Sequence, residues 1–205
     1  MLRNIRFLSV IILLSMTACT PLILSTMGMK KPHVPTDEVF YRFGEKWNMS
    51  IYYQQILLSS YIDEIEKLDS INPKLANDLL QPIQAMYFDS SGRLISYHIN
   101  CYAGGYPNLN WNRFGNFDVF PAKTNAPCDS LVTLSWLLPF LKPVEYPCVK
   151  INDLDYTVIV FWSHFTGRQS RHLVEFVQEN LKLASKESRI QIMYVNTDEV
   201  FTKLF

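Results

Sequence analysis

The stretch Tyr156-Thr-Val-Ile-Val-Phe-Trp-Ser-His-Phe-Thr-Gly-Arg-Gln169 decides the fold of this chain. Its early part, Thr157–Phe161, contains five β-prone residues in a row, which is typical of a buried strand. A helical pattern over residues 170–184 follows at once, so the connection is a tight turn. A second β-rich segment, Ile190–Val195, comes after that helix. This order predicts a right-handed β-α-β unit with two parallel strands.

A β-hairpin and several helices are expected before this unit. Ile83–Phe88 and Leu94–Asn100 are joined by a turn that ends in Gly92, which can adopt a positive φ. Helices are expected from Thr36 onward, over Ile51–Leu68, from Asn72 to Leu80 and over Cys128–Leu141. We therefore predict an α/β fold, a mixed sheet flanked by helices, in a single domain over residues 36–205 with an N-terminal helical part over residues 36–80.

The central stretch resembles the active-site segment of thioredoxins, where Phe-Trp-Ala-x-Trp-Cys-Gly-Pro-Cys carries the redox pair at the start of a helix. Phe161, Trp162 and Gly167 match that segment. Thr166 and Gln169 occupy the two cysteine positions, so this segment lacks the two sulfur atoms that the dithiol chemistry of the family requires. The resemblance implies a thioredoxin-like sheet without the redox motif. Because the hairpin precedes the β-α-β unit, a permuted order of the segments is left open.

The N-terminus has the features of a secretory signal. Two arginines precede the uncharged apolar run Phe7–Met16. The following Met16-Thr-Ala-Cys19 resembles the lipobox of bacterial lipoproteins, which implies a signal peptide over residues 1–18, lipid attachment at Cys19 and a tether over residues 19–35. The alternative is an uncleaved anchor helix, because no charge occurs from residue 7 to 29. Both interpretations tether the chain to a membrane of the cell envelope, as in small bacterial lipoproteins with a degenerate thioredoxin-like module.

Charge and motifs exclude several classes of function. The chain has 19 acidic and 19 basic residues and no long basic run, so nucleic-acid binding is not expected. His98 and His164 are not spaced like metal ligands, so neither a metal nor another cofactor is expected. No phosphate loop and no Gly-x-Ser-x-Gly motif occurs, which makes catalysis the less favoured interpretation.

The turn Thr166-Gly167-Arg168-Gln169 is the first candidate site. It places the backbone N–H groups of Gly167, Arg168 and Gln169 at a helix N-terminus, close to a second arginine, Arg171. Such an end binds anions or carboxylates. In the alternative, Thr166 only caps the helix and the arginines are ordinary surface residues.

The long segment Tyr102–Pro127 is the second candidate site. Its aromatic residues alternate with asparagines, and Tyr106 and Trp111 could stack on a sugar or grip a peptide. The favoured alternative is that these aromatic residues form a small core that pins the loop to the sheet.

Three cysteines remain besides the lipid-attachment residue: Cys101, Cys128 and Cys148. An odd number outside the cytoplasm leaves at least one thiol free or paired between chains. Two hypotheses follow. The first is a non-catalytic, membrane-tethered module that binds a peptide, protein or glycan through the turn and the aromatic loop. The second is a thiol-disulfide enzyme that uses Cys101 with Cys128 in place of the missing Cys-x-x-Cys motif.

Overall fold

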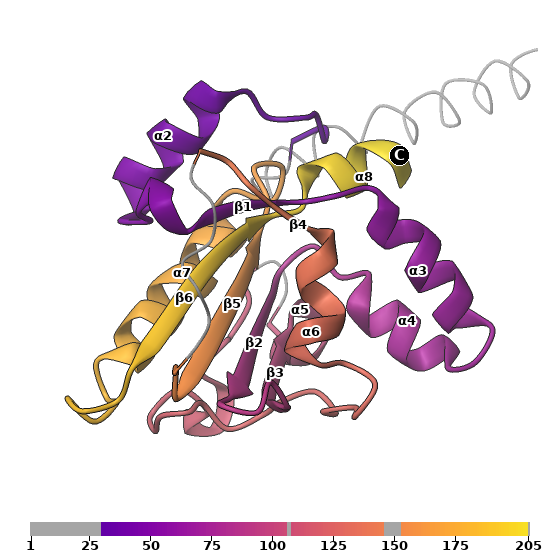
Figure 1. Ribbon diagram of the computed structural model, residues 1–205. Helices are drawn as coiled ribbons and strands as arrows, with labels where there is room; N and C mark the ends of the chain where they lie inside the picture. The colour runs from indigo at the N-terminus through magenta and orange to yellow at the C-terminus, as the bar shows by residue number, and fades with distance from the viewer. Residues whose placement is uncertain (1–29, 106–107, 146–152, 205) are drawn as a thin grey trace, which may run out of the picture.

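The computed structural model describes residues 30–105, 108–145 and 153–204. A six-stranded mixed sheet lies between two layers of helices, which confirms the predicted α/β class (Figure 1). The strand order is β3-β2-β5-β6-β1-β4. The strands are β1 (Gln54–Leu57), β2 (Gln84–Asp89), β3 (Leu94–Ile99), β4 (Leu141–Pro143), β5 (Tyr156–Trp162) and β6 (Ile190–Asn196). The helices are α2 (Asp37–Trp47), α3 (Ser60–Asp69), α4 (Pro73–Leu79), α5 (Asn100–Ala103), α6 (Leu134–Leu137), α7 (Arg168–Leu181) and α8 (Asp198–Leu204).

The centre of the sheet is the predicted β-α-β unit with the predicted hairpin beside it. β5 and β6 run parallel, from the Tyr156–Ile190 pair to the Trp162–Asn196 pair, and α7 connects them. The β2–β3 hairpin joins on the other side, because β2 pairs with β5 in the antiparallel direction. The parallel β-α-β order and the hairpin are confirmed.

The sheet separates two hydrophobic cores, and alternate residues of β5 face each one. Val158, Val160 and Trp162 pack toward α2 and α7, whereas Ile159 and Phe161 pack toward α3, α4, α6 and α8. All five side chains are fully buried. A strand that is buried on both faces has a continuous apolar sequence, which explains why Thr157–Phe161 gave so clear a signal.

The expected helix over Ile51–Leu68 is wrong. The segment divides into a 3-10 helix (Ile51–Tyr53), β1 and α3, and β1 lies between β6 and β4. The four residues of β1 bond to these neighbours, and this long-range pairing outweighs the local helical pattern. Residues 36–80 therefore supply a strand to the sheet as well as helices.

The expected helix over Cys128–Leu141 is much shorter than predicted. α6 covers only four residues and is followed by a 3-10 helix (Leu138–Phe140) and by β4. Its cap is Thr133, whose hydroxyl accepts a hydrogen bond from the Trp136 N–H group. The helix from Asn72 is confirmed as α4, with the Asn72 side chain accepting from the Leu75 N–H group and Pro73 in the first turn.

The aromatic segment between α5 and α6 packs against the layer that contains α7. Trp111 and Phe117 are buried, and the Asn180 side chain donates hydrogen bonds to the carbonyl groups of Phe117 and Val119. The interpretation of these aromatic residues as a small core is confirmed for Trp111 and Phe117 but not for Phe114, whose side chain is 82% exposed. Trp111 has no exposed surface on which a sugar could stack. Tyr106 lies outside the described residues.

The signal peptide, Cys19 and the tether up to residue 29 also lie outside the described residues. Within the described part, no helix is both long and apolar enough to cross a membrane.

Candidate anion-binding site

A buried network fixes the turn that follows β5. Asp198 is fully buried at the start of α8, and its carboxylate accepts hydrogen bonds from the Ser163 hydroxyl at 2.7 Å and the His164 N–H group at 2.9 Å. The Ser163 N–H group donates to the Ser170 hydroxyl of α7 at 2.9 Å. These bonds connect the ends of β5, α7 and α8, so the turn has a defined shape before any ligand arrives.

The predicted site residues of the turn differ in their accessibility. Thr166 and Gln169 are buried, whereas Arg168 is exposed. The capping role considered for Thr166 is wrong, because Gly167 is the cap residue at φ 33° and the Thr166 hydroxyl bonds to the Ser170 hydroxyl at 2.6 Å. Thr166 therefore stabilises the inside of the turn.

The backbone of the turn offers less to an anion than the sequence predicted. The Gly167 N–H group donates to the His164 carbonyl at 3.3 Å, and the Gln169 N–H group donates to the Thr166 carbonyl at 3.0 Å. Of the three predicted N–H donors, only that of Arg168 is left for a ligand. Any anion bound here is held mainly by side chains.

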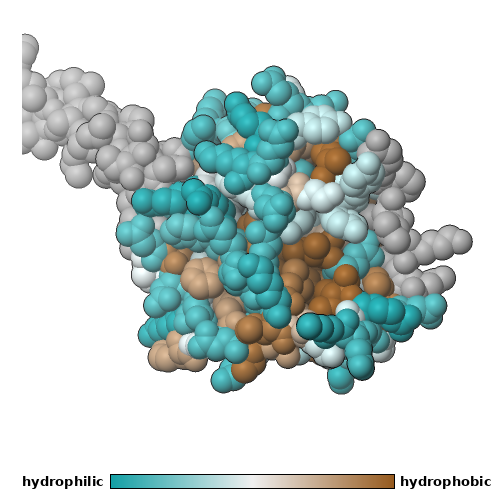
Figure 2. All heavy atoms as spheres, turned by 90° about the vertical axis from the view of Figure 1, so that its left-hand side faces the viewer, coloured by the Kyte–Doolittle hydropathy of each residue, from teal (hydrophilic) through white to brown (hydrophobic). Residues whose placement is uncertain are grey.

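These side chains surround a cavity of about 290 Å³ beside the turn. We call it the basic pocket, and its lining consists of Lys30, Phe43, Lys46, Trp47, His164, Gly167, Arg168 and Arg171. It lies beyond the carboxyl end of β5, the edge at which α/β sheets generally bind their ligands. Figure 2 shows that hydrophilic side chains cover the upper part of this side of the molecule, where α2 lies in Figure 1, and that hydrophobic side chains are exposed below.

The basic pocket has an excess of positive charge. Arg171 pairs with Glu175 at 2.7 Å, but none of the ion pairs between described residues includes Lys30, Lys46 or Arg168. The pocket lining contains no carboxylate. Three cations that line one cavity without an ion-pair partner favour an anionic ligand.

His164 lines this pocket and carries a buried polar atom without a hydrogen-bond partner. The side chain is only 6% exposed, and its Nδ1 atom has no hydrogen-bond partner. The ring packs edge-on against His33 at 4.7 Å and Phe43 at 5.3 Å between ring centroids. Burial, and then the positive charge of Lys30, lower the pKa of the His164 imidazole below its usual value. A buried ring nitrogen without a partner is costly, and a ligand that hydrogen-bonds to it would remove that cost.

The sequence located the turn but missed the α2 side of the pocket. Phe43, Lys46 and Trp47 are about 120 positions before the turn in the chain, and only the packing of α2 against α7 brings them to it. The signal that could have found them is the apolar face of α2 with a lysine between the two aromatic residues.

Residues typical of a serine hydrolase occur together here without the required geometry. The Ser163 hydroxyl is fully buried and donates directly to Asp198, with no histidine ring between them. An acyl-transfer triad needs the imidazole between the serine and the carboxylate. The arrangement is therefore a structural link. The described residues also contain no group of His, Cys, Asp or Glu side chains that could hold a metal ion.

The two described thiols lack the lowered pKa that redox chemistry requires. Cys101 and Cys128 are both free and exposed. Partial burial nevertheless raises the pKa of both thiols, and the Asp78 carboxylate raises that of Cys101 further. A reactive cysteine requires the opposite shift, because the thiolate is the nucleophile. Cys148 lies outside the described residues.

Comparison with known proteins gave no matching family model, and no curated protein or solved structure matches the chain. The basic pocket and the sequence features of the N-terminus are therefore the features of this chain that indicate a function.

Proposed function

We propose that this protein is a lipid-anchored lipoprotein of the cell envelope whose thioredoxin-like module binds, without catalysis, an anionic group of a peptide, protein or glycan in the basic pocket. The observation that carries the proposal is the unpaired Nδ1 atom of His164 in a pocket that three cations without ion-pair partners also line. A carboxylate or phosphate oxygen would accept hydrogen bonds from the cations and from a protonated Nδ1 atom.

The arrangement of the central strands supports a thioredoxin-like module. The hairpin lies beside β5, and α7 begins where thioredoxins carry their redox pair. The hairpin comes before β5 in the chain, as a permuted order requires. Buried Thr166 and Gln169 occupy the cysteine positions, so binding is favoured over thiol chemistry at this turn.

The binding proposal is tested with inorganic phosphate and with two peptides that differ only in a free or amidated C-terminus. We expect the purified protein to bind phosphate and the free carboxylate but not the amide, and the pKa of His164 to rise on binding. Arg168→Glu should weaken binding at least about tenfold, because a charge-assisted hydrogen bond becomes a repulsion. Lys186→Glu is the matched control, since Lys186 is exposed and does not line the pocket. Equal effects of the two variants would refute the site.

The lipid anchor needs its own experiment. Intact mass of the membrane-extracted protein should correspond to a chain that begins at Cys19 and carries lipid, and Cys19→Ser should abolish this form. A chain that retains residues 1–18 would favour the uncleaved anchor helix instead. This result does not affect the binding proposal, which concerns only the folded domain.

A further inference from the structure

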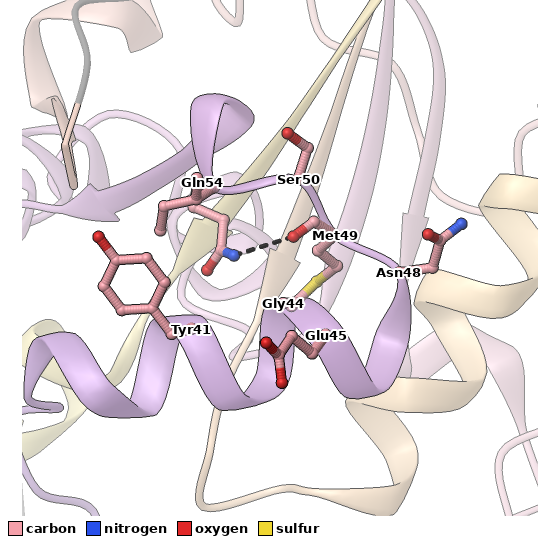
Figure 3. A pocket seen from close by; sticks show the side chains of 8 residues that line it. Tyr41, Gly44, Glu45, Asn48, Met49, Ser50 and Gln54 are labelled. Carbon is pink, nitrogen blue, oxygen red and sulfur yellow. Dashed lines mark hydrogen bonds between the residues drawn. The ribbon is translucent and has the colours of Figure 1, made fainter.

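A second pocket lies on the opposite face of α2, where the helix meets the 3-10 helix and β1 (Figure 3). Its volume is about 330 Å³. The lining consists of Tyr41, Gly44, Glu45, Asn48, Met49, Ser50, Ile51 and Gln54. None of these residues lines the basic pocket, so the two cavities share α2 but no side chain.

The Gln54 amide is held in one orientation at this pocket. Its Nε2 atom donates to the carbonyl groups of Phe40 at 3.2 Å and Met49 at 3.1 Å, so the amide oxygen must point away from both. Gly44 makes this arrangement possible, because a Cβ atom there would lie only 2.7 Å from Nε2. The side chain is 1% exposed, and its Oε1 atom has no hydrogen-bond partner. In Figure 3 this oxygen points to the side on which Tyr41 lies.

The charge of the pocket is negative. Glu45 is the single charged residue of the lining, and its carboxylate is exposed. A second carboxylate, that of Glu145, accepts a hydrogen bond from the Tyr41 hydroxyl at 2.7 Å. No ion pair between described residues includes either glutamate. The pocket thus combines negative charge and an unsatisfied buried acceptor with the apolar side chains of Met49 and Ile51.

We propose that this pocket binds a primary alkylammonium group, as carried by the lysine side chain of a peptide. The ammonium group would pair with Glu45 and donate a hydrogen bond to Gln54 Oε1, and the Tyr41 ring would contribute a cation–π contact. The alkyl stem would pack on Met49 and Ile51. An anion or a neutral apolar ligand would leave the Gln54 oxygen without a donor. The inference is independent of the function proposed for the basic pocket.

The test compares two ligands that share the four-carbon side chain and differ in the terminal ammonium group, Nα-acetyl-lysine amide and Nα-acetyl-norleucine amide. Chemical shifts of the Met49 methyl group in the full chain report binding. We expect the lysine ligand to bind and the norleucine ligand to produce no shift. Glu45→Gln should weaken lysine binding at least about tenfold, the loss of one charged hydrogen bond. Glu38→Gln, at an exposed position of the same helix outside the pocket, should change the affinity less than about twofold, because salt screens a remote charge.

Three outcomes would overturn the proposal. Equal binding of both ligands would indicate an apolar groove. Equal weakening by Glu45→Gln and Glu38→Gln would indicate a general effect of net charge. An ordered water bonded to Gln54 Oε1, with no shift at the Met49 methyl group on addition of the lysine ligand, would show that water alone satisfies this oxygen.

Discussion

The Ser163 hydroxyl donates a 2.7 Å hydrogen bond to the Asp198 carboxylate across 35 positions of the chain, and both side chains are fully buried. The same carboxylate accepts from the His164 N–H group and from the Asn196 side chain, each at 2.9 Å. One residue therefore holds together the carboxyl ends of β5 and β6. The position of His164 in the basic pocket depends on this link.

Replacing Asp198 should destabilise the fold and disorder the turn. Asp198→Ala leaves three buried donors without an acceptor, so we expect the free energy of unfolding to fall by about 3 kcal/mol or more. Urea unfolding measures the loss, and Asp63→Ala, at an exposed carboxylate of α3, should change the stability by no more than about 0.5 kcal/mol. If both variants unfolded at the same urea concentration, the network would not stabilise the fold.

The elements that the sequence predicted correctly have local signals. The apolar run of β5, the Gly92 turn and the Asn72-Pro73 cap each act through neighbouring residues, and the structure contains all three. β1 was missed because its strand character comes from pairing with β6 and β4, whose residues are far away in the chain. Whether a short strand near the edge of a sheet forms depends more on the strands it pairs with than on its own composition.

The difference between local and long-range signals also explains which residues of the basic pocket could be predicted. Gly167 and Arg168 could be identified because a strand-turn-helix pattern marks the N-terminus of α7. Lys30 and Lys46 could not, since nothing in the sequence shows that α2 packs against α7 at this end. The burial of Gln169 could not be predicted either, because a polar residue in a turn is ordinarily expected at the surface.

His98 should make stability depend on pH. The ring is fully buried, its Nδ1 atom has no partner, and burial lowers the pKa of His98 from 6.5 to about 4. The unfolded chain therefore binds a proton as the pH falls below about 6.5, while the folded chain binds it only near pH 4. The contribution of His98 to stability is fully present above its pKa in the unfolded chain. The free energy of unfolding should therefore fall by about 2 kcal/mol between pH 7 and pH 5.

Variants separate His98 from the other histidines in this experiment. The pKa of His164 is also lowered, so His164 contributes to the decrease in the same direction. The His98→Gln variant should retain the decrease in stability that is due to His164 and lose the decrease that is due to His98. Its stability should therefore depend less on pH than that of the unmodified protein. A decrease of the same size in His98→Gln would assign the effect to other groups.

The thiols should behave as isolated, poorly reactive groups. Because the pKa values of Cys101 and Cys128 are raised, less thiolate is present at pH 7 than in a free cysteine, and iodoacetamide should react with both more slowly than with glutathione. Intact mass after maleimide labelling should give the same number of labelled thiols with and without prior reduction, and Cys101→Ser and Cys128→Ser should each remove one label. Two additional labels after mild reduction would show a disulfide between two of the three cysteines. If Cys101→Ser and Cys128→Ser each abolished that difference, the bridge would join these two, and the thiol-disulfide enzyme would become the better explanation of this fold.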